Sequence, residues 1–133
     1  LKHMRYRFSI LIAILFISCQ KSPVVKSVEL NQEFSLKAGD TGIIKDLQGS
    51  LKVVSINDSR CPEGVQCIWA GSADVIIAIE SESTGAVNDT LRSYDKPVIT
   101  LADFSISLIE VAPYPKVKGQ VKDKEARLFI TQD

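Results

Sequence analysis

The amino-acid sequence predicts an all-β domain, either an antiparallel immunoglobulin-like sandwich or a small barrel, with roughly seven or eight strands. Two observations predict this class. Apolar residues alternate with polar residues in short runs separated by turn-forming residues, and no segment of the expected domain sustains a helical period. The length of 133 residues and the hydrophobic content of 45% fit one globular domain.

The clearest strand is expected over residues 72–80. Alternate positions from Ala73 to Ile79 are apolar and lie on one face of such a strand. Ile76 and Ala78 make the other face half apolar, which is typical of a strand inside a sheet. We therefore expect this strand to be central.

A second clear strand begins at Phe104, where Ile106 and Leu108 continue an alternation with serines. The pattern changes phase at Ile109, which predicts a β-bulge near Leu108, and Pro113 ends the strand because proline cannot donate to a ladder. Residues 81–89 are expected to form a hairpin loop. The other strands are expected at residues 33–37, 41–45, 51–56, 90–93, 98–101 and 126–131.

The charge balance argues against nucleic-acid binding. The chain has 16 basic and 16 acidic side chains, and a neutral protein lacks the electrostatic attraction on which such binding depends. Charges of both signs gather at residues 116–125. We expect this segment to be a solvated surface loop, with contact to anionic lipid as the alternative.

The N-terminus has the pattern of a signal peptide. Residues 1–3 are interpreted as a remnant ahead of the natural start at Met4, and residues 4–18 as a lipoprotein signal peptide. Arg5 and Arg7 precede an apolar run over residues 8–17. A membrane-spanning helix needs ~20 apolar residues, so this run is too short to span.

Residues 15–19, Leu-Phe-Ile-Ser-Cys, resemble the lipobox of bacterial lipoproteins, although Phe16 stands where leucine is usual. The resemblance implies that Cys19 is acylated and becomes the mature N-terminus, and two acyl chains suffice for stable membrane anchoring. Residues 19–30 are then a lipid-anchored tether and residues 31–133 a single β domain. The resemblance implies a membrane-anchored envelope protein. In some lipoproteins an acidic cluster just after the cysteine directs export to the cell surface, and none follows Cys19, so we expect this protein to face the periplasm.

Cys61 and Cys67 are the two other cysteines, and an exported protein meets an oxidising compartment, so a disulfide between them is expected. A metal site is disfavoured because the one histidine is His3, ahead of the expected start. A thiol–disulfide catalyst is disfavoured because five residues, rather than two, separate the cysteines. Two interpretations remain. The disulfide is either purely structural, or it stabilises a recognition loop whose tip is formed by Pro62, Glu63, Gly64, Val65 and Gln66.

Three side chains near the cysteines have expected structural roles. Trp69 lies between Ile68 and Ala70 before a strand and is predicted to pack in the core or beside the disulfide. Asp58 and Arg60 are predicted to brace the loop through backbone hydrogen bonds or a mutual ion pair.

The cysteine segment resembles a segment of small, uncharacterised exported bacterial proteins, many of them predicted lipoproteins. The resemblance covers about residues 34–130, and a second shared segment lies at residues 108–115. It implies a compact β domain with Cys61 paired to Cys67, and it implies no activity. The residues that carry it are Asp58, Ser59, Arg60, Cys61, Pro62, Val65, Cys67, Trp69, Ala70 and Gly71.

The sequence predicts a protein that is not an enzyme. Without a histidine after the signal peptide the usual nucleophilic triads are absent, and no phosphate-binding or zinc-protease motif occurs. No catalytic residue, metal ligand or cofactor is assigned. The expected function is a non-catalytic binding or structural module of the envelope, whose partner is an envelope protein or glycan. The alternatives are an inhibitor of an exported protease that acts through the Cys61–Cys67 loop, and a carbohydrate-active hydrolase with two carboxylates.

Overall fold

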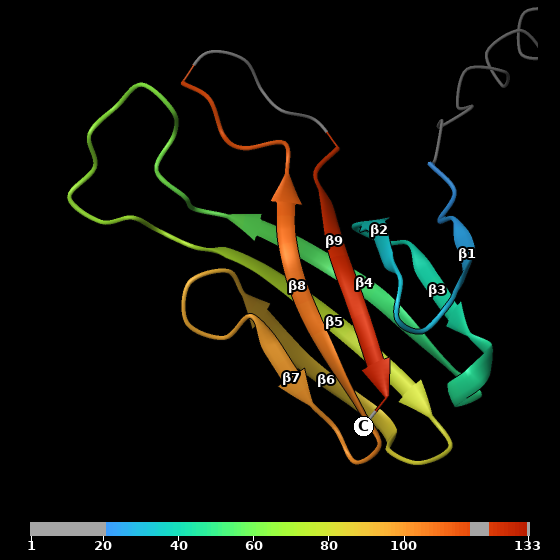
Figure 1. Ribbon diagram of the computed structural model, residues 1–133. Coiled ribbons are helices and arrows are strands. Elements are labelled where there is room, and N and C mark those ends of the chain that lie inside the picture. Colours follow the sequence, from blue (N-terminus) through green and yellow to red (C-terminus); the bar gives the residue numbers. More distant parts are fainter. Residues whose placement is uncertain (1–20, 118–122, 133) are drawn as a thin grey trace, which may run out of the picture.

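The computed structural model describes residues 21–117 and 123–132. These residues form a β-sandwich of two sheets, which are not closed into a barrel (Figure 1). The expected all-β class is therefore confirmed, and the structure adopts the sandwich alternative. The predicted signal peptide and Cys19 lie outside the described residues. No helix in the described ranges is long and apolar enough to cross a membrane.

Nine strands and one short 3-10 helix, η1, make up the described part of the fold, slightly more strands than predicted. Their bounds, in chain order, are β1 Val25–Val28, β2 Glu33–Lys37, β3 Thr41–Ile44, η1 Lys45–Leu47, β4 Gly49–Asp58, β5 Ala73–Ser81, β6 Gly85–Arg92, β7 Val98–Thr100, β8 Phe104–Ala112 and β9 Glu125–Gln132.

The strands divide into a five-stranded sheet, in the order β1-β3-β4-β5-β6, and a four-stranded sheet, in the order β2-β9-β8-β7. Pairs are antiparallel except for β1 and β3, which run parallel. Consecutive strands β2 and β3 lie in different sheets, so the turn between them carries the chain across the sandwich.

The core lies between the two sheets and is made by alternate residues of the inner strands. In β5, every second residue from Ala73 to Ile79 is buried, and β5 lies between β4 and β6, as expected for a central strand. Leu51 from β4 faces this core, with Phe104 and Leu128 contributed by the second sheet. Burying a large apolar side chain contributes about 1.5–3 kcal/mol each, so these residues are the main source of stability.

Strand β8 has the irregularity that the sequence predicted. Its pairing with β9 shifts register between Leu108 and Glu110, and Ile109 is left exposed. The strand ends at Ala112, immediately before Pro113. The extra residue restores the inward direction of Val111, which is buried.

Two segment predictions were wrong. A hairpin joins β5 to β6 as predicted, but its loop does not extend over residues 81–89, because β6 already begins at Gly85 and pairs with β5 through Arg92. This strand lies at the edge of its sheet and buries only Leu91 fully, so its composition is that of a loop. The expected tether at residues 19–30 contains β1, which pairs with β3 and buries Val28. The folded part thus begins earlier in the chain than predicted.

Candidate functional site

The site is built on the long connection between β4 and β5, residues 59–72, which we call the disulfide loop. Its base is narrow: the Ser59 amide donates to the Ser72 carbonyl at 2.8 Å, and the Cys61 amide to the Ala70 carbonyl at 2.9 Å. Gly71 has φ +71°, and a Cβ there would lie 1.9 Å from the Ser59 carbonyl oxygen. Only glycine fits this position, so the close approach of the two loop stems depends on it.

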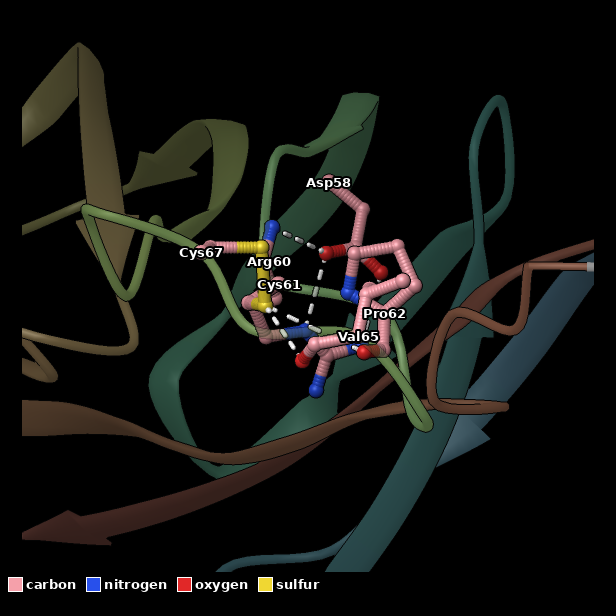
Figure 2. Close-up of a disulfide and its surroundings, with 6 residues drawn as sticks. All are labelled: Asp58, Arg60, Cys61, Pro62, Val65 and Cys67. Atoms are coloured by element: carbon pink, nitrogen blue, oxygen red, sulfur yellow. Dashed lines mark hydrogen bonds and ion pairs between the residues drawn. A yellow bond between two sulfur atoms is a disulfide. The ribbon is translucent and has the colours of Figure 1, made fainter.

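The predicted disulfide between Cys61 and Cys67 closes the loop above its base (Figure 2), with the two Cα atoms 5.9 Å apart. A further backbone hydrogen bond joins the Glu63 amide to the Pro115 carbonyl at 3.1 Å. The loop is therefore attached both to its own stems and to the segment that follows β8.

Asp58, the last residue of β4, anchors the foot of the disulfide loop. Its side chain is 1% exposed and accepts two hydrogen bonds from the Arg60 guanidinium, at 2.8 and 2.7 Å. The Lys124 ammonium, just before β9, also contacts this carboxylate. The predicted ion pair between Asp58 and Arg60 is thus confirmed, and it is buried rather than solvated.

Arg60 extends the same cluster to the second sheet. Its Nη2 donates to the Val111 carbonyl of β8 at 2.8 Å, and its guanidinium lies 4.4 Å from the centre of the Tyr114 ring. A planar guanidinium makes such bidentate and stacked contacts together. The cluster of Asp58, Arg60, Lys124 and Tyr114 therefore joins the loop foot to the ends of β8 and β9.

The electrostatics of this cluster favour the charged forms. Burial alone raises the pKa of Asp58, but hydrogen bonds from Arg60 and Lys124 outweigh it and lower the pKa from 3.8 to about 2. The hydrogen bond to Asp58 in turn raises the pKa of Arg60 above its ordinary value. Asp58 is therefore a carboxylate over the physiological pH range and is fully used in holding the structure.

The outer part of the disulfide loop is exposed from Glu63 to Ala70. Its most exposed apolar side chains are Ile68, at 93%, and Trp69, at 82%. The prediction that Trp69 packs in the core was wrong. Strand β5 begins at Ala73, within one residue of the predicted start, and Trp69 lies before it in the disulfide loop, from which the buried core takes no residue.

The residues predicted as the recognition tip lie at the surface. Pro62 is half-buried, whereas Glu63, Gly64, Val65 and Gln66 are exposed. Their role in recognition stays a prediction.

Beside the loop lies a surface hollow of about 480 Å³, which we call the Trp69–Tyr94 hollow. Trp69 reaches it from the disulfide loop and Tyr94, which is 78% exposed, from the connection between β6 and β7. These two connections lie on the same side of the sandwich in Figure 1. The lining residues are Ser59, Trp69, Ala70, Gly71, Ser72, Asp74, Arg92, Tyr94 and Asp95.

Sequence reasoning missed Tyr94, Arg92 and Asp95 as site residues. They are distant in sequence from the cysteines, and the antiparallel register of β5 with β6, in which Asp74 pairs with Arg92, brings them beside the loop. That register depends on where β6 begins, which the sequence did not reveal. The one feature of the sequence that could have indicated this site is Tyr94, an aromatic residue among polar turn residues.

Charged groups of the hollow are only loosely paired. Arg92 Nε lies 3.9 Å from Asp74, and Arg92 Nη1 lies 3.6 Å from Asp95, with all three side chains at least 36% exposed. The Ser72 hydroxyl donates to Asp74 at 2.6 Å. This arrangement offers hydrogen-bonding groups of both signs next to two aromatic rings.

A second and larger hollow, of about 820 Å³, lies next to the beginning of the described chain, and we call it the lysine hollow. Its lining includes residues 21–24 and five lysines. Asp40, its buried acid, already accepts hydrogen bonds from the amides of Val24 and Lys37, at 3.1 Å each. The lysines are Lys21, Lys26, Lys37, Lys52 and Lys124.

The described residues hold no group of three or more histidine, cysteine, aspartate or glutamate side chains placed to bind a metal ion. Comparisons with protein-family models, with curated proteins and with solved structures find no match to this chain. The class that fold and site define is an all-β sandwich with a disulfide-closed loop. Function is therefore argued from the site itself, and the resemblance noted in the sequence stays a prediction.

Proposed function

We propose that this protein is a non-catalytic, lipid-anchored module of the bacterial cell envelope that binds a partner through the disulfide loop. The observation that carries this proposal is the exposure of Ile68 and Trp69, at 93% and 82%, on a loop tied down at its foot. Large apolar side chains held together in water are typical of interaction surfaces, and tryptophan is among the residues most enriched in binding hot spots.

The rigidity of the loop supports a role in binding. The disulfide, the Cys61–Ala70 backbone hydrogen bond and the buried Asp58 cluster fix its stems. A fixed loop loses little conformational entropy when a partner binds, so more of the contact energy remains as affinity.

The lysine hollow supports anchoring at the N-terminal side. Lys21 lies two residues after Cys19, so acylation of Cys19 would hold Lys21 within roughly 7 Å of the modified residue. Lysines near a membrane surface are attracted to anionic lipid, by about 1 kcal/mol each. Among the described residues of the segment 116–125, Lys124 lines this hollow, and its ammonium also forms an ion pair with Asp58.

A periplasm-facing position is part of the proposal. The Cys61–Cys67 disulfide fits an oxidising compartment. The anchor is tested by mass spectrometry of the N-terminal peptide from membranes of a bacterial host that expresses the full chain. We expect a diacylated N-terminal cysteine at position 19, and release of the Cys19→Ser variant to the soluble fraction.

The double variant Cys61→Ser/Cys67→Ser is the matched control, because it changes two other cysteines and should stay on the membrane. Detection of an unmodified Cys19 in membrane-bound protein would contradict lipid anchoring.

Loop recognition is tested by capture of envelope components, proteins and glycans, on the immobilised mature protein. Replacing Ile68 and Trp69 together by alanine should abolish capture of any specific component. Val54→Ala is the control, because Val54 is a 48% exposed apolar residue of β4, outside the loop. Equal capture by the double variant would contradict recognition through this loop.

A second candidate is an inhibitor of an exported protease. The observation that favours it is the exposed segment from Glu63 to Ile68, which projects from the surface and is held by the disulfide. A panel of extracellular and periplasmic proteases tests this function. Inhibition that is lost in Val65→Asp would support it.

A further inference from the structure

We propose that the Trp69–Tyr94 hollow is a binding site for a neutral saccharide. The inference rests on the proposed binding function and specifies its ligand. It names Trp69 and Tyr94 as the stacking groups, with Asp74, Asp95 and Arg92 as the groups that bind hydroxyls.

The aromatic side chains supply the first part of the argument. Trp69 and Tyr94 come from different connections, are 82% and 78% exposed, and line the same hollow. Each ring combines an apolar face with a polar tip. The C–H faces of a pyranose ring match such apolar faces, and its hydroxyls match the polar groups around them.

The charged groups supply the second part. Arg92 lies 3.9 Å from Asp74 and 3.6 Å from Asp95, beyond the distance of about 2.7–2.9 Å for a strong charged hydrogen bond. Their hydrogen-bonding capacity is therefore only partly used within the protein. Sugar hydroxyls donate to carboxylates and accept from a guanidinium, so one ligand can engage all three groups.

The balance of charge argues against an anionic ligand, and a saccharide without acidic groups meets this condition. Two carboxylates, Asp74 and Asp95, face the hollow against the single guanidinium of Arg92. This local excess of negative charge repels phosphorylated or otherwise anionic ligands. The lysine hollow, where anions would be attracted, is a separate site that shares no lining residue with this one.

The walls of the hollow are preformed. The Ser93 amide donates to the Ala73 carbonyl at 3.0 Å, and the Ala73 amide donates to the Ser93 hydroxyl at 2.9 Å. These bonds join the start of β5 to the connection that carries Tyr94. The volume of about 480 Å³ lies within the 300–1,000 Å³ range of small-ligand sites.

Concavity favours a saccharide over a protease as the ligand of these aromatic groups. An inhibitor inserts a projecting side chain into its target, whereas Trp69 and Tyr94 border a depression that receives a ligand. Ile68 is 93% exposed and does not line the hollow. A contact with a protein partner can therefore involve Ile68, whereas the hollow that would bind the saccharide is lined by Trp69 and not by Ile68.

Intrinsic fluorescence tests the inference directly, because Trp69 is the only tryptophan of the chain. The mature protein is titrated with chitotetraose, cellotetraose and maltotetraose. We expect at least one of them to shift the emission to shorter wavelength and to protect Trp69 from quenching by acrylamide.

Tyr94→Ala is the principal variant, because it keeps the tryptophan that reports binding. We expect it to weaken binding at least tenfold, which corresponds to about 1.4 kcal/mol. Asp74→Asn should weaken it several-fold, and Val54→Ala, which changes an exposed residue of β4 outside the hollow, should leave it unchanged. Trp69→Ala, measured by calorimetry, should remove binding, and circular dichroism verifies that each variant is folded.

The inference is overturned if none of the three saccharides changes the emission at about 10 mM, a concentration that detects affinities weaker than 1 mM. It is also overturned if binding is the same in Tyr94→Ala. Capture of an envelope protein that depends on Ile68, together with no response to saccharides, would reject the saccharide and leave the proposed function standing. Cleavage of the bound saccharide would support the ligand class but contradict the non-catalytic function.

Discussion

Two aspartate–arginine pairs flank the disulfide loop, and they differ in almost every physical respect. Asp58 and Arg60 form a bidentate pair at 2.7 and 2.8 Å, with the carboxylate 1% exposed. Asp74 and Arg92 are 3.9 Å apart, and their side chains are 36% and 48% exposed. The first pair is a fixed part of the fold, whereas the second keeps polar groups available at the surface.

The contrast is notable because the two aspartates are close in the sheet. In the register of β4 with β5, Asp58 is opposite Ala73, the residue next to Asp74. Asp58 lies where the loop foot, β8 and β9 converge, and Lys124 and Arg60 cover it. Asp74 follows the buried Ala73 and therefore lies on the outer face of β5, opposite Arg92 of β6, where solvent reaches it. Position among the strands, rather than residue type, decides which carboxylate is structural.

The largest expected effect comes from Asp58→Asn, which leaves Arg60 and Lys124 without their carboxylate. Removing one partner of a buried ion pair costs about 3–5 kcal/mol, and we expect the lower end because Lys124 is 21% exposed. Urea unfolding followed by circular dichroism measures this loss. A change below about 1 kcal/mol would show that the cluster does not stabilise the fold.

The next effect is expected from Cys61→Ser/Cys67→Ser. A disulfide that closes a ring this short restricts the unfolded chain by about 2–2.5 kcal/mol. The free energy of unfolding should fall by that amount, while the far-ultraviolet spectrum stays that of a β protein. Loss of the β spectrum would mean that the bridge is required for folding, not only for holding the loop.

The pH dependence of stability should separate Asp58 from other acids. Its pKa is about 2 in the folded protein against 3.8 as the reference value, so its contribution is present above pH 3.8 and is lost as the pH falls through 2. The difference corresponds to about 2 kcal/mol. The stability gap between wild type and Asp58→Asn should narrow by that amount between pH 5 and pH 2, and a constant gap would contradict the assignment.

The smallest effect is expected from Asp74→Asn, the counterpart of the first variant. Exposed ion pairs contribute about 0–1 kcal/mol, and asparagine can still accept the hydrogen bond that Ser72 donates at 2.6 Å. The free energy of unfolding should change by less than about 0.5 kcal/mol. A loss similar to that of Asp58→Asn would remove the distinction between the two pairs.

Sequence reasoning predicted the parts of the fold that are governed by regular burial. The alternation in β5, the bulge near Leu108 and the pairing of Cys61 with Cys67 all follow from local patterns. It failed at the two edges of the five-stranded sheet, because β1 and β6 bury few side chains and their composition is that of loops.

The candidate site was predicted only in part. The loop and its cysteines were predicted, but the exposure of Trp69 depends on the path of the loop outside the sandwich, which its apolar neighbours in the sequence do not indicate. Tyr94 and Arg92 come to the site through strand pairing over a long separation in sequence, which no local pattern reports. The residues that line the hollow opposite the disulfide loop are therefore set by the order and pairing of the strands.

The outer edge strand β6 has a consequence for self-association. An open strand of eight residues is a template on which a second chain can add, and such addition leads to polymers. Here the Lys96 ammonium donates to Asp89 at 2.6 Å, and the partly exposed Arg92 lies 3.6 Å from Asp95, so charge lies along that edge. Neutralising these charges would remove the electrostatic barrier to strand addition at this edge and should favour fibrous aggregation.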